Sequence, residues 1–242
     1  MIQKTVSPPA PGERLADDET EPVSLLVQTK LITPTAAHSN DELFVAPGRA
    51  GLAVKRLVDI TVSLAALAVC APLMALLAAI IKLDSPGPVL YVQERVTRGG
   101  LRFRLLKFRS MPVDAEDSTG PVWAVPNDPR LTRVGRVMRH YSLDELPQFV
   151  NVLRGEMSVV GPRPERPYFI EQFQATVPNY LARQQTKAGI TGWAQVHGLR
   201  GNTSIEERAR YDLYYVTHWS LLLDLRIMVL TLTRMFHDDN AY

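Results

Sequence analysis

Hydrophobic residues are concentrated in one uninterrupted run in the first half of the chain. From Ile60 to Ile81 no residue is charged, and Pro72 lies near the centre of the run. A helix rises roughly 1.5 Å per residue, so a run of this length can just cross the hydrocarbon of a bilayer. The pattern predicts a membrane helix, and we expect the protein to work at a membrane.

Pro72 leaves two arrangements of this run open. A proline removes a backbone donor and costs a straight helix about 3 kcal/mol, although membrane helices tolerate prolines at kinks. The run is therefore either a kinked single span or a helix-break-helix hairpin that enters and leaves by the same face. Lys55 and Arg56 precede it and Lys82 follows it. Because basic flanks are typical of the cytoplasmic side, we favour the hairpin.

The chain divides into three parts on either side of this run. Residues 1–47 contain six prolines and the acidic patch at 17–19, a composition typical of a disordered tail. Residues 48–84 form the predicted re-entrant membrane segment, and residues 85–242 form a compact cytoplasmic domain. No internal repeat is visible.

Short elements of both kinds are expected in this domain. Residues 89–92 and 103–108 read as strands joined at Gly99-Gly100. Apolar spacing and helix-favouring residues predict helices at 132–141, 143–153, 164–174 and 204–217. The fold class is therefore α+β and mainly helical, with short strands.

The segment 219–236 is apolar but is interrupted by Asp224 and Arg226, with Trp219 at its start. This pattern is typical of an amphipathic helix lying in the membrane interface. A buried core helix is the alternative, and the pattern does not separate the two.

The net charge is only +2, so the distribution of charged residues is more informative than their sum. Between Arg95 and Arg109 six residues are basic and none is acidic, and arginines then recur every third residue from 130 to 139. Such clusters suit anionic lipid headgroups, nucleotide phosphates or nucleic acid. The single cysteine, Cys70, rules out a disulfide framework and fits a cytoplasmic setting.

The acidic pair Asp144-Glu145 is the first candidate for chemistry. It follows Ser142, a natural helix N-cap, and acids in a first turn stabilise a helix without any further role. Its neighbours are basic, however, with Arg139 just before it. A carboxylate among arginines stays ionised and can act as a nucleophile or bind a divalent cation. Adjacent helical residues diverge by about 100°, so the pair does not suit a glycosidase.

Two further strings carry candidate phosphate ligands. In 161–165, prolines on both sides of Arg163 stiffen the backbone, so the guanidinium is preorganised for a phosphate. The glycine-rich segment 187–201 lacks the ending of a Walker loop and contributes Arg200. His197 in this segment is expected to be a structural hydrogen-bonding group. The five histidines show no spacing typical of a zinc site.

Four strings in fixed order behind a proline-broken apolar helix resemble one family. They are residues 107–111, 142–148, 161–165 and 189–196. The family is that of the bacterial sugar transferases, the monotopic polyprenyl-phosphate phosphoglycosyl transferases that start exopolysaccharide and O-antigen assembly. The resemblance covers residues 54–242. Larger relatives carry an N-terminal bundle of membrane helices, whereas this chain has a short tail there.

The resemblance implies a re-entrant helix broken near Pro72 and a catalytic domain on the cytoplasmic face of the bacterial inner membrane. It implies that Asp144 attacks the sugar-proximal phosphorus of a UDP-sugar and releases UMP. Undecaprenyl phosphate then takes the phosphosugar. Glu145 is the partner of Asp144, and Mg²⁺ would lie between these carboxylates and the diphosphate. The expected phosphate ligands are Lys107, Arg109, Arg139, Arg163 and Arg200.

The expected partners are the UDP-sugar, undecaprenyl phosphate and inner-membrane lipids, with a homo-oligomer possible and no nucleic acid. The sugar, glucose or galactose, is left open. A membrane-tethered protein that binds lipid or nucleic acid without catalysis is one alternative, but base stacking would need interleaved aromatics and only Phe103 and Phe108 offer them. A metal-dependent pyrophosphatase that hydrolyses nucleotide-sugars is another.

Overall fold

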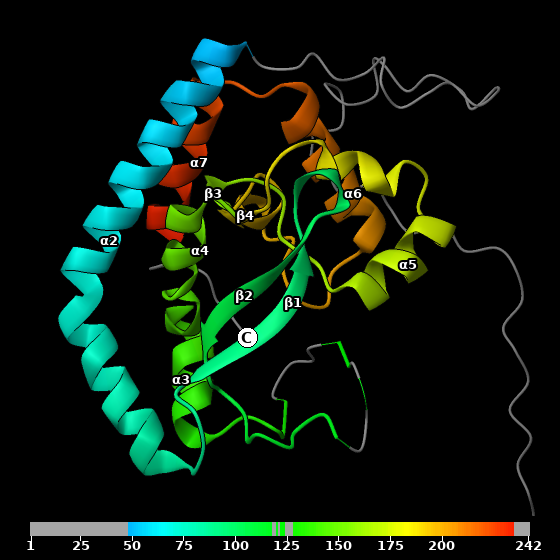
Figure 1. The fold of residues 1–242 in the computed structure, drawn as a ribbon. Helices are drawn as coiled ribbons and strands as arrows, with labels where there is room; N and C mark the ends of the chain where they lie inside the picture. The colour runs from blue at the N-terminus through cyan, green and yellow to red at the C-terminus, as the bar shows by residue number, and fades with distance from the viewer. Residues whose placement is uncertain (1–47, 118–119, 121, 124–127, 235–242) are drawn as a thin grey trace, which may run out of the picture. The chain divides into compact units, whose positions relative to one another are not determined.

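The computed structural model describes residues 48–117, 120, 122–123 and 128–234 (Figure 1). The predicted disordered tail, residues 1–47, lies outside the described residues. In the described part, helices predominate and the strands form two sheets of two strands each. This arrangement confirms the mainly helical α+β class.

The apolar run lies in one long helix, α2 (Arg49–Asp84), which remains helical through Pro72. The ribbon changes direction partway along its length, so the helix is bent rather than straight (Figure 1). Among the described residues, α2 is the one helix long and apolar enough to cross a membrane by length and composition. Whether it spans or re-enters stays a prediction.

The N-terminal half of α2 buries polar residues and exposes apolar ones. Lys55, Asp59 and Ser63 are buried at a spacing of four residues, which places them on one face of the helix. Leu57 and Leu64 are more than half exposed. This is the reverse of a soluble helix. The polar face therefore packs on the domain, and the apolar face is left for a lipid environment.

The predicted strand pair is confirmed. The first strand begins one residue later and ends four residues later than predicted, and the second begins one residue earlier. β1 (Leu90–Val96) pairs antiparallel with β2 (Arg102–Phe108), and a short 3-10 turn, η1 (Arg98–Gly100), connects them. Gly99 and Gly100 have positive φ values of 70° and 77°, a conformation that glycine adopts without steric cost.

Helix α3 (Arg133–His140) matches the prediction, and the side chain of Thr132 caps it by accepting a hydrogen bond from the Gly135 amide at 2.9 Å. The following helix was predicted wrongly as one element over 143–153. It consists of a 3-10 turn, η2 (Leu143–Glu145), and then α4 (Gln148–Arg154).

The cause of this break lies in two residues. Ser142 has a left-handed backbone, with φ 55°, and its side chain does not cap the turn, contrary to its expected role. Pro147 has no amide hydrogen and fits the start of a helix rather than its middle. Asp144 and Glu145 therefore lie on a tight turn in front of α4, not in the first turn of an α-helix.

Two short parallel strands, β3 (Ser158–Val160) and β4 (Gly189–Thr191), join segments far apart in the sequence. Glycines allow their ends to approach closely. A Cβ on Gly189 would lie 2.1 Å from the Gly161 amide nitrogen, and one on Gly192 would lie 2.3 Å from the Gly161 carbonyl oxygen. This contact fixes the start of the 161–165 string against the glycine-rich segment.

The remaining elements are α5 (Pro167–Thr176), the 3-10 turns η3 (Tyr180–Gln185) and η4 (Gln195–His197), α6 (Ile205–Thr217) and α7 (Leu221–Arg234). Helix α5 begins later than predicted, because Pro167 rather than Pro164 occupies its first turn. Helix α6 agrees with the prediction, and Ser204 caps it.

Helix α7 is buried on one side only. Asp224 and Ile227 are buried, whereas the apolar side chains exposed along the opposite side are Leu222, Leu225, Val229 and Leu232. A wholly buried core helix is therefore excluded. An exposed apolar stripe is what a helix in the membrane interface needs. Tyr215, Val160 and Ile227 belong to the largest hydrophobic core, which joins α6, β3 and α7.

Candidate active site

One cavity of about 730 Å³ brings together every catalytic and phosphate-binding residue predicted from the sequence. These residues are Lys107, Arg109, Arg139, Asp144, Glu145, Arg163 and Arg200. They come from β2, α3, η2 and three loop segments, so the fold alone assembles them. Pro72 does not line this cavity, although Val62, Ala66 and Cys70 of the same helix do.

Asp144 lies on η2, lines the cavity and is 4% exposed. The Nζ atom of Lys107 lies 3.8 Å from its Oδ2 atom, which is beyond hydrogen-bonding distance. Burial raises the pKa of Asp144, and the charge of Lys107 lowers it in part. A poorly solvated carboxylate with a cation nearby is a good nucleophile.

Glu145 is held far more tightly than its neighbour. Lys107 Nζ donates to Glu145 Oε1 at 2.8 Å, and Arg163 donates to both carboxylate oxygens, with Nη1 3.1 Å from Oε2. Burial alone would raise the pKa of Glu145, but Arg163 and Lys107 outweigh it and hold the pKa well below its usual range. Glu145 is therefore ionised and orients the two cations.

A second layer holds Arg163 in place. Arg183 donates from Nη2 to the Arg163 carbonyl oxygen at 2.9 Å. The same guanidinium forms a buried ion pair with Asp212 on α6, at 2.6 Å. Glu145 raises the pKa of Arg163, so the guanidinium stays charged. Arg183 thus fixes the loop between the two prolines, and the sequence had not indicated this residue.

A further buried network was missed from the sequence. Glu165 pairs with Arg95 of β1 at 3.5 Å and with Arg208 of α6 at 3.3 Å. Burial lowers the pKa of Arg95 to about 10, although Glu165 raises it in part. Arg95 and Glu165 each lie in a string that the sequence marked, but Arg208 carries no local signal. All three line the cavity.

The other predicted phosphate ligands differ in how they are engaged. Arg139 donates from Nε to Ser110 Oγ at 3.0 Å, and its charge lowers the pKa of Asp144 in part. Arg200 lines the cavity from the segment after η4. Both side chains are placed to attract an anion into the cavity.

Arg109 has a structural task. Its guanidinium donates to the carbonyl oxygens of Ser85 and Pro86, both at 2.6 Å, just after the end of α2. Arginine commonly satisfies the last carbonyls of a helix in this way. Its use as a phosphate ligand is a prediction that this geometry does not favour.

His197 behaves as the structural group that was expected. Its Nδ1 atom lies 2.7 Å from the Trp193 carbonyl oxygen, and its ring packs edge-on against the Trp193 ring. Burial lowers the pKa of His197. It is not among the residues that line the cavity.

The donor set fits a magnesium ion only when substrate supplies further ligands. In the described ranges no group of three or more His, Cys, Asp or Glu side chains could hold a metal. Glu145 is occupied by two cations, whereas Asp144 has oxygen lone pairs to offer. Magnesium is commonly bound by one or two carboxylates together with substrate phosphates. Asp144 is therefore the residue that would hold it.

Comparison with known proteins identifies a family and several relatives of this chain. The model of the bacterial sugar transferase family matches residues 50–238. A UDP-glucose:undecaprenyl-phosphate glucose-1-phosphate transferase of Caulobacter vibrioides is 45% identical over 192 residues, covering 78% of this chain and 72% of the relative. A transferase of the same name in Escherichia coli K12 is 42% identical over 193 residues, covering 78% of this chain and 41% of the relative.

A UDP-N-acetylgalactosamine-undecaprenyl-phosphate N-acetylgalactosaminephosphotransferase of Aeromonas hydrophila is 42% identical over 197 residues. That match covers 81% of this chain and 46% of the relative. The chain thus spans less than half the length of the Escherichia and Aeromonas relatives. Because the family model matches most of the sequence, the chain belongs to the bacterial sugar transferase family.

Proposed function

We propose that the protein transfers a hexose 1-phosphate from a UDP-sugar to undecaprenyl phosphate, releasing UMP. This would be the first membrane step in the synthesis of an exopolysaccharide or O-antigen, at the cytoplasmic face of the inner membrane. The observation that carries the proposal is that two adjacent carboxylates differ in their contacts with the surrounding cations. Glu145 is saturated by cations, whereas Asp144 is buried beside them with its oxygens outside hydrogen-bonding distance of Lys107.

In the first step, an Asp144 oxygen attacks the sugar-proximal phosphorus of the UDP-sugar. The bond from this phosphorus to the bridging oxygen breaks, and UMP leaves with the electron pair. The hexose phosphate remains on Asp144 as an acyl phosphate. Lys107, Arg139 and Arg163 supply positive charge where the transferring phosphoryl group and the leaving phosphate carry negative charge.

In the second step, a phosphate oxygen of undecaprenyl phosphate attacks the same phosphorus. The acyl-phosphate bond breaks, Asp144 recovers its carboxylate, and the product is the undecaprenyl diphosphate sugar. The two steps replace one difficult displacement between two anions. Glu145 holds Lys107 and Arg163 in position throughout and does not transfer a proton, since its pKa is well below neutrality.

Magnesium is part of the proposal because the diphosphate is strongly anionic. When bound, the ion would withdraw charge from the diphosphate and make UMP a better leaving group. Asp144 is the residue of this chain that would hold it. The residues themselves bind and orient the phosphates and bury the reacting carboxylate.

A membrane acceptor is supported by the surroundings of the cavity. Val62, Ala66 and Cys70 of α2, together with Met228 and Leu232 of α7, form an apolar wall of the same cavity that contains Asp144. Helices α2 and α7 also present exposed apolar side chains. These apolar surfaces support a lipid phosphate as the acceptor that enters the cavity.

The choice of sugar stays open. The relatives compared above are named for UDP-glucose and for UDP-N-acetylgalactosamine, at nearly equal identity to this chain. The residues that we propose to act on the diphosphate are the same whichever sugar is transferred.

The test is a reaction in which the full-length protein, in detergent with Mg²⁺, meets a UDP-sugar without lipid. We expect one equivalent of UMP per enzyme, a phosphohexose adduct on the peptide containing Asp144, and turnover when undecaprenyl phosphate is added. Asp144→Asn should form no adduct and lose several powers of ten in rate. Glu207→Gln, an exposed change on α6, is the matched control and should behave as the unmodified protein.

Two results would contradict the proposal. Many turnovers of UMP without lipid would indicate a pyrophosphatase that hydrolyses the nucleotide-sugar. A folded Asp144→Asn protein that keeps more than about a tenth of the rate would rule out the covalent step, because an amide cannot replace the nucleophile.

A further inference from the structure

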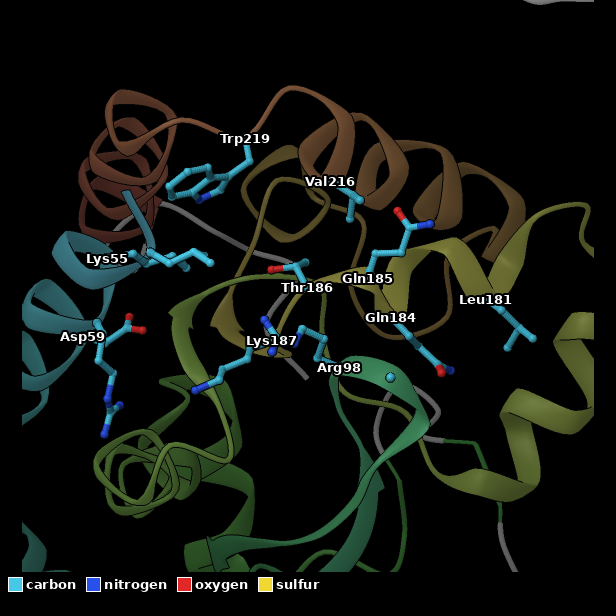
Figure 2. Close-up of a pocket in the computed structure, with 13 residues that line it drawn as sticks. Lys55, Asp59, Arg98, Leu181, Gln184, Gln185, Thr186, Lys187, Val216 and Trp219 are labelled. Atoms are coloured by element: carbon cyan, nitrogen blue, oxygen red, sulfur yellow. The ribbon is translucent and has the colours of Figure 1, made fainter. Parts of the chain in front are cut away.

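A second cavity, of about 680 Å³, lies beside the N-terminal half of α2. It is formed by α2, the tip of the β1–β2 hairpin at η1, the segment 181–187 and Trp219 (Figure 2). None of its lining residues also lines the cavity that contains Asp144. It is therefore a separate site on the same domain, independent of the proposed catalysis.

The lining of this cavity is strongly basic. Its charged residues are Lys55, Arg56, Arg98, Lys187 and one acid, Asp59. Three of these are already engaged within the fold, since Lys55 pairs with Asp224, Arg56 donates to the carbonyls at the end of α4, and Asp59 accepts from β3. Arg98 and Lys187 form no ion pair with any described residue.

The unengaged cations crowd one region of the cavity. Figure 2 shows Arg98 and Lys187 on the same side of the cavity, with Trp219 and Val216 across from them. A Cβ placed on Gly155 would lie 3.7 Å from Lys187 Nζ and 3.8 Å from an Arg56 Nη atom, so these two cations also approach one point. Burial lowers the pKa of Lys187, and the charges of Arg56 and Arg98 lower it further. Like charges held together in this way favour a bound anion.

The uncharged residues that line the cavity indicate which kind of anion it can bind. Leu52, Leu181 and Trp219 give the cavity apolar edges, and Gln184 adds an amide. Leu52 and Leu181 are exposed, and Leu57, one turn further along α2, is 64% exposed. Tryptophan at the end of an apolar helix is typical of the level of lipid headgroups. A small inorganic anion would leave these apolar edges uncovered.

We propose that this cavity binds a phosphate ester through Arg98 and Lys187. The apolar edges favour the headgroup of an anionic phospholipid as its source. The phosphate lies between the two cations, and the glycerol backbone lies against Leu52 and Trp219. Such a lipid would secure the domain to the bilayer at a point distinct from the catalytic cavity.

The experiment measures binding to the full-length protein in a nonionic detergent by titration calorimetry at fixed ionic strength. The probes are short-chain phosphatidylglycerol, short-chain phosphatidylcholine and glycerol phosphate without acyl chains. The test variant is Arg98→Gln with Lys187→Gln. The matched control is Arg102→Gln with Arg210→Gln, which removes the same charge from exposed surface positions outside the cavity.

We expect phosphatidylglycerol to bind the unmodified protein and the control equally, and the test variant about tenfold more weakly or worse, since two charge-assisted hydrogen bonds are lost. Phosphatidylcholine should bind more weakly than phosphatidylglycerol. Binding of glycerol phosphate alone with the same dependence on Arg98 and Lys187 would support the phosphate site and assign it to a soluble ester. Equal binding to the test variant and the unmodified protein, or no binding of any probe, would overturn the proposal.

The variant is expected to fold, because removing charge from a crowded basic cluster relieves repulsion. Its melting temperature without ligand should equal or exceed that of the unmodified protein. Arg98→Gln alone changes one exposed residue of a turn and serves as a second variant. It should weaken phosphatidylglycerol binding by a smaller factor, and unaltered binding would count against the proposal.

Discussion

Arg163 and Glu145 face each other in a two-pronged ion pair, in which each of the two terminal nitrogens of the guanidinium donates to a different carboxylate oxygen. This geometry fixes the plane of both groups and not merely their distance. Because Glu145 directly follows Asp144, the pair also fixes the turn that carries the proposed nucleophile. The ion pair thus fixes the position of the loop around Arg163 relative to the turn at η2.

The first prediction concerns this geometry. Arg163→Lys keeps the charge but makes one hydrogen bond where arginine makes two, so the rate of UMP release should fall by about tenfold or more. Arg163→Gln should cost about a hundredfold or more, since the charge is lost as well. Steady-state kinetics with a UDP-sugar and undecaprenyl phosphate measures both. Equal activity of the lysine variant would show that charge alone suffices.

The second prediction concerns magnesium. Because the described residues hold no group of three metal ligands, the ion should bind weakly to the free protein and depend on the substrate diphosphate. Chelation should abolish activity, and the concentration of Mg²⁺ that restores half of it should fall as the UDP-sugar concentration rises. Titration of Mg²⁺ at several UDP-sugar concentrations tests this. Tight binding of Mg²⁺ to the free protein would contradict it.

The third prediction concerns the attachment of α2 to the domain. Lys55 Nζ lies 2.7 Å from Asp224 Oδ2, and both side chains are buried. Lys55→Met leaves this carboxylate without its cation and should lower the free energy of unfolding by roughly 3–5 kcal/mol. Tyr215 and Trp219, which donate to Asp224, soften the loss.

An exposed ion pair on the β1–β2 hairpin provides the control for this change. Arg102 and Glu94 lie 2.9 Å apart, and both side chains are more than half exposed. Arg102→Met should change stability by less than about 1 kcal/mol. Denaturation in detergent compares the two variants. Equal losses would mean that the Lys55–Asp224 pair does not link α2 to α7.

The fourth prediction concerns the topology of α2. If the helix re-enters, tags at the N-terminus and after Tyr242 both report from the cytoplasm. Pro72→Leu restores a backbone hydrogen bond and adds helix propensity of up to about 3 kcal/mol, so part of the population should span the membrane. A cysteine introduced at Thr5, in a Cys70→Ser background, is labelled from outside with an impermeant reagent. Reaction in the protein that retains Pro72 would rule out the hairpin.

The local elements could be predicted from the sequence because their signals are local. Short apolar segments on either side of Gly99 and Gly100 indicated the strand pair, and the helices predicted from Thr132 and from Ser204 agree with α3 and α6. The break before α4 was missed although Pro147 was visible, because the apolar spacing continues across it. The left-handed backbone of Ser142 has no signal in its residue type.

The site could be predicted as a set of residues but not as a set of roles. The basic clusters predicted an anion site. Residue spacing does not predict that Arg109 donates to carbonyls just after the end of α2, whereas Lys107, two residues away, donates to Glu145. Lys55 was read as a basic flank of a membrane helix. Its partner Asp224 lies 169 residues away, and such pairing depends on the whole fold.

The buried polar face of α2 has a consequence for attempts to obtain a water-soluble form of this enzyme. A membrane anchor is usually treated as a detachable tether. Cutting the chain after Asp84 would remove Lys55, Arg56 and Asp59. It would leave the buried Asp224 without its cation, and the carbonyls ending α4 and the edge of β3 without these donors and acceptors. The helix that is long and apolar enough for a membrane is also packed into the domain, so solubility has to be sought by changing the exposed apolar side of α2 rather than by deleting it.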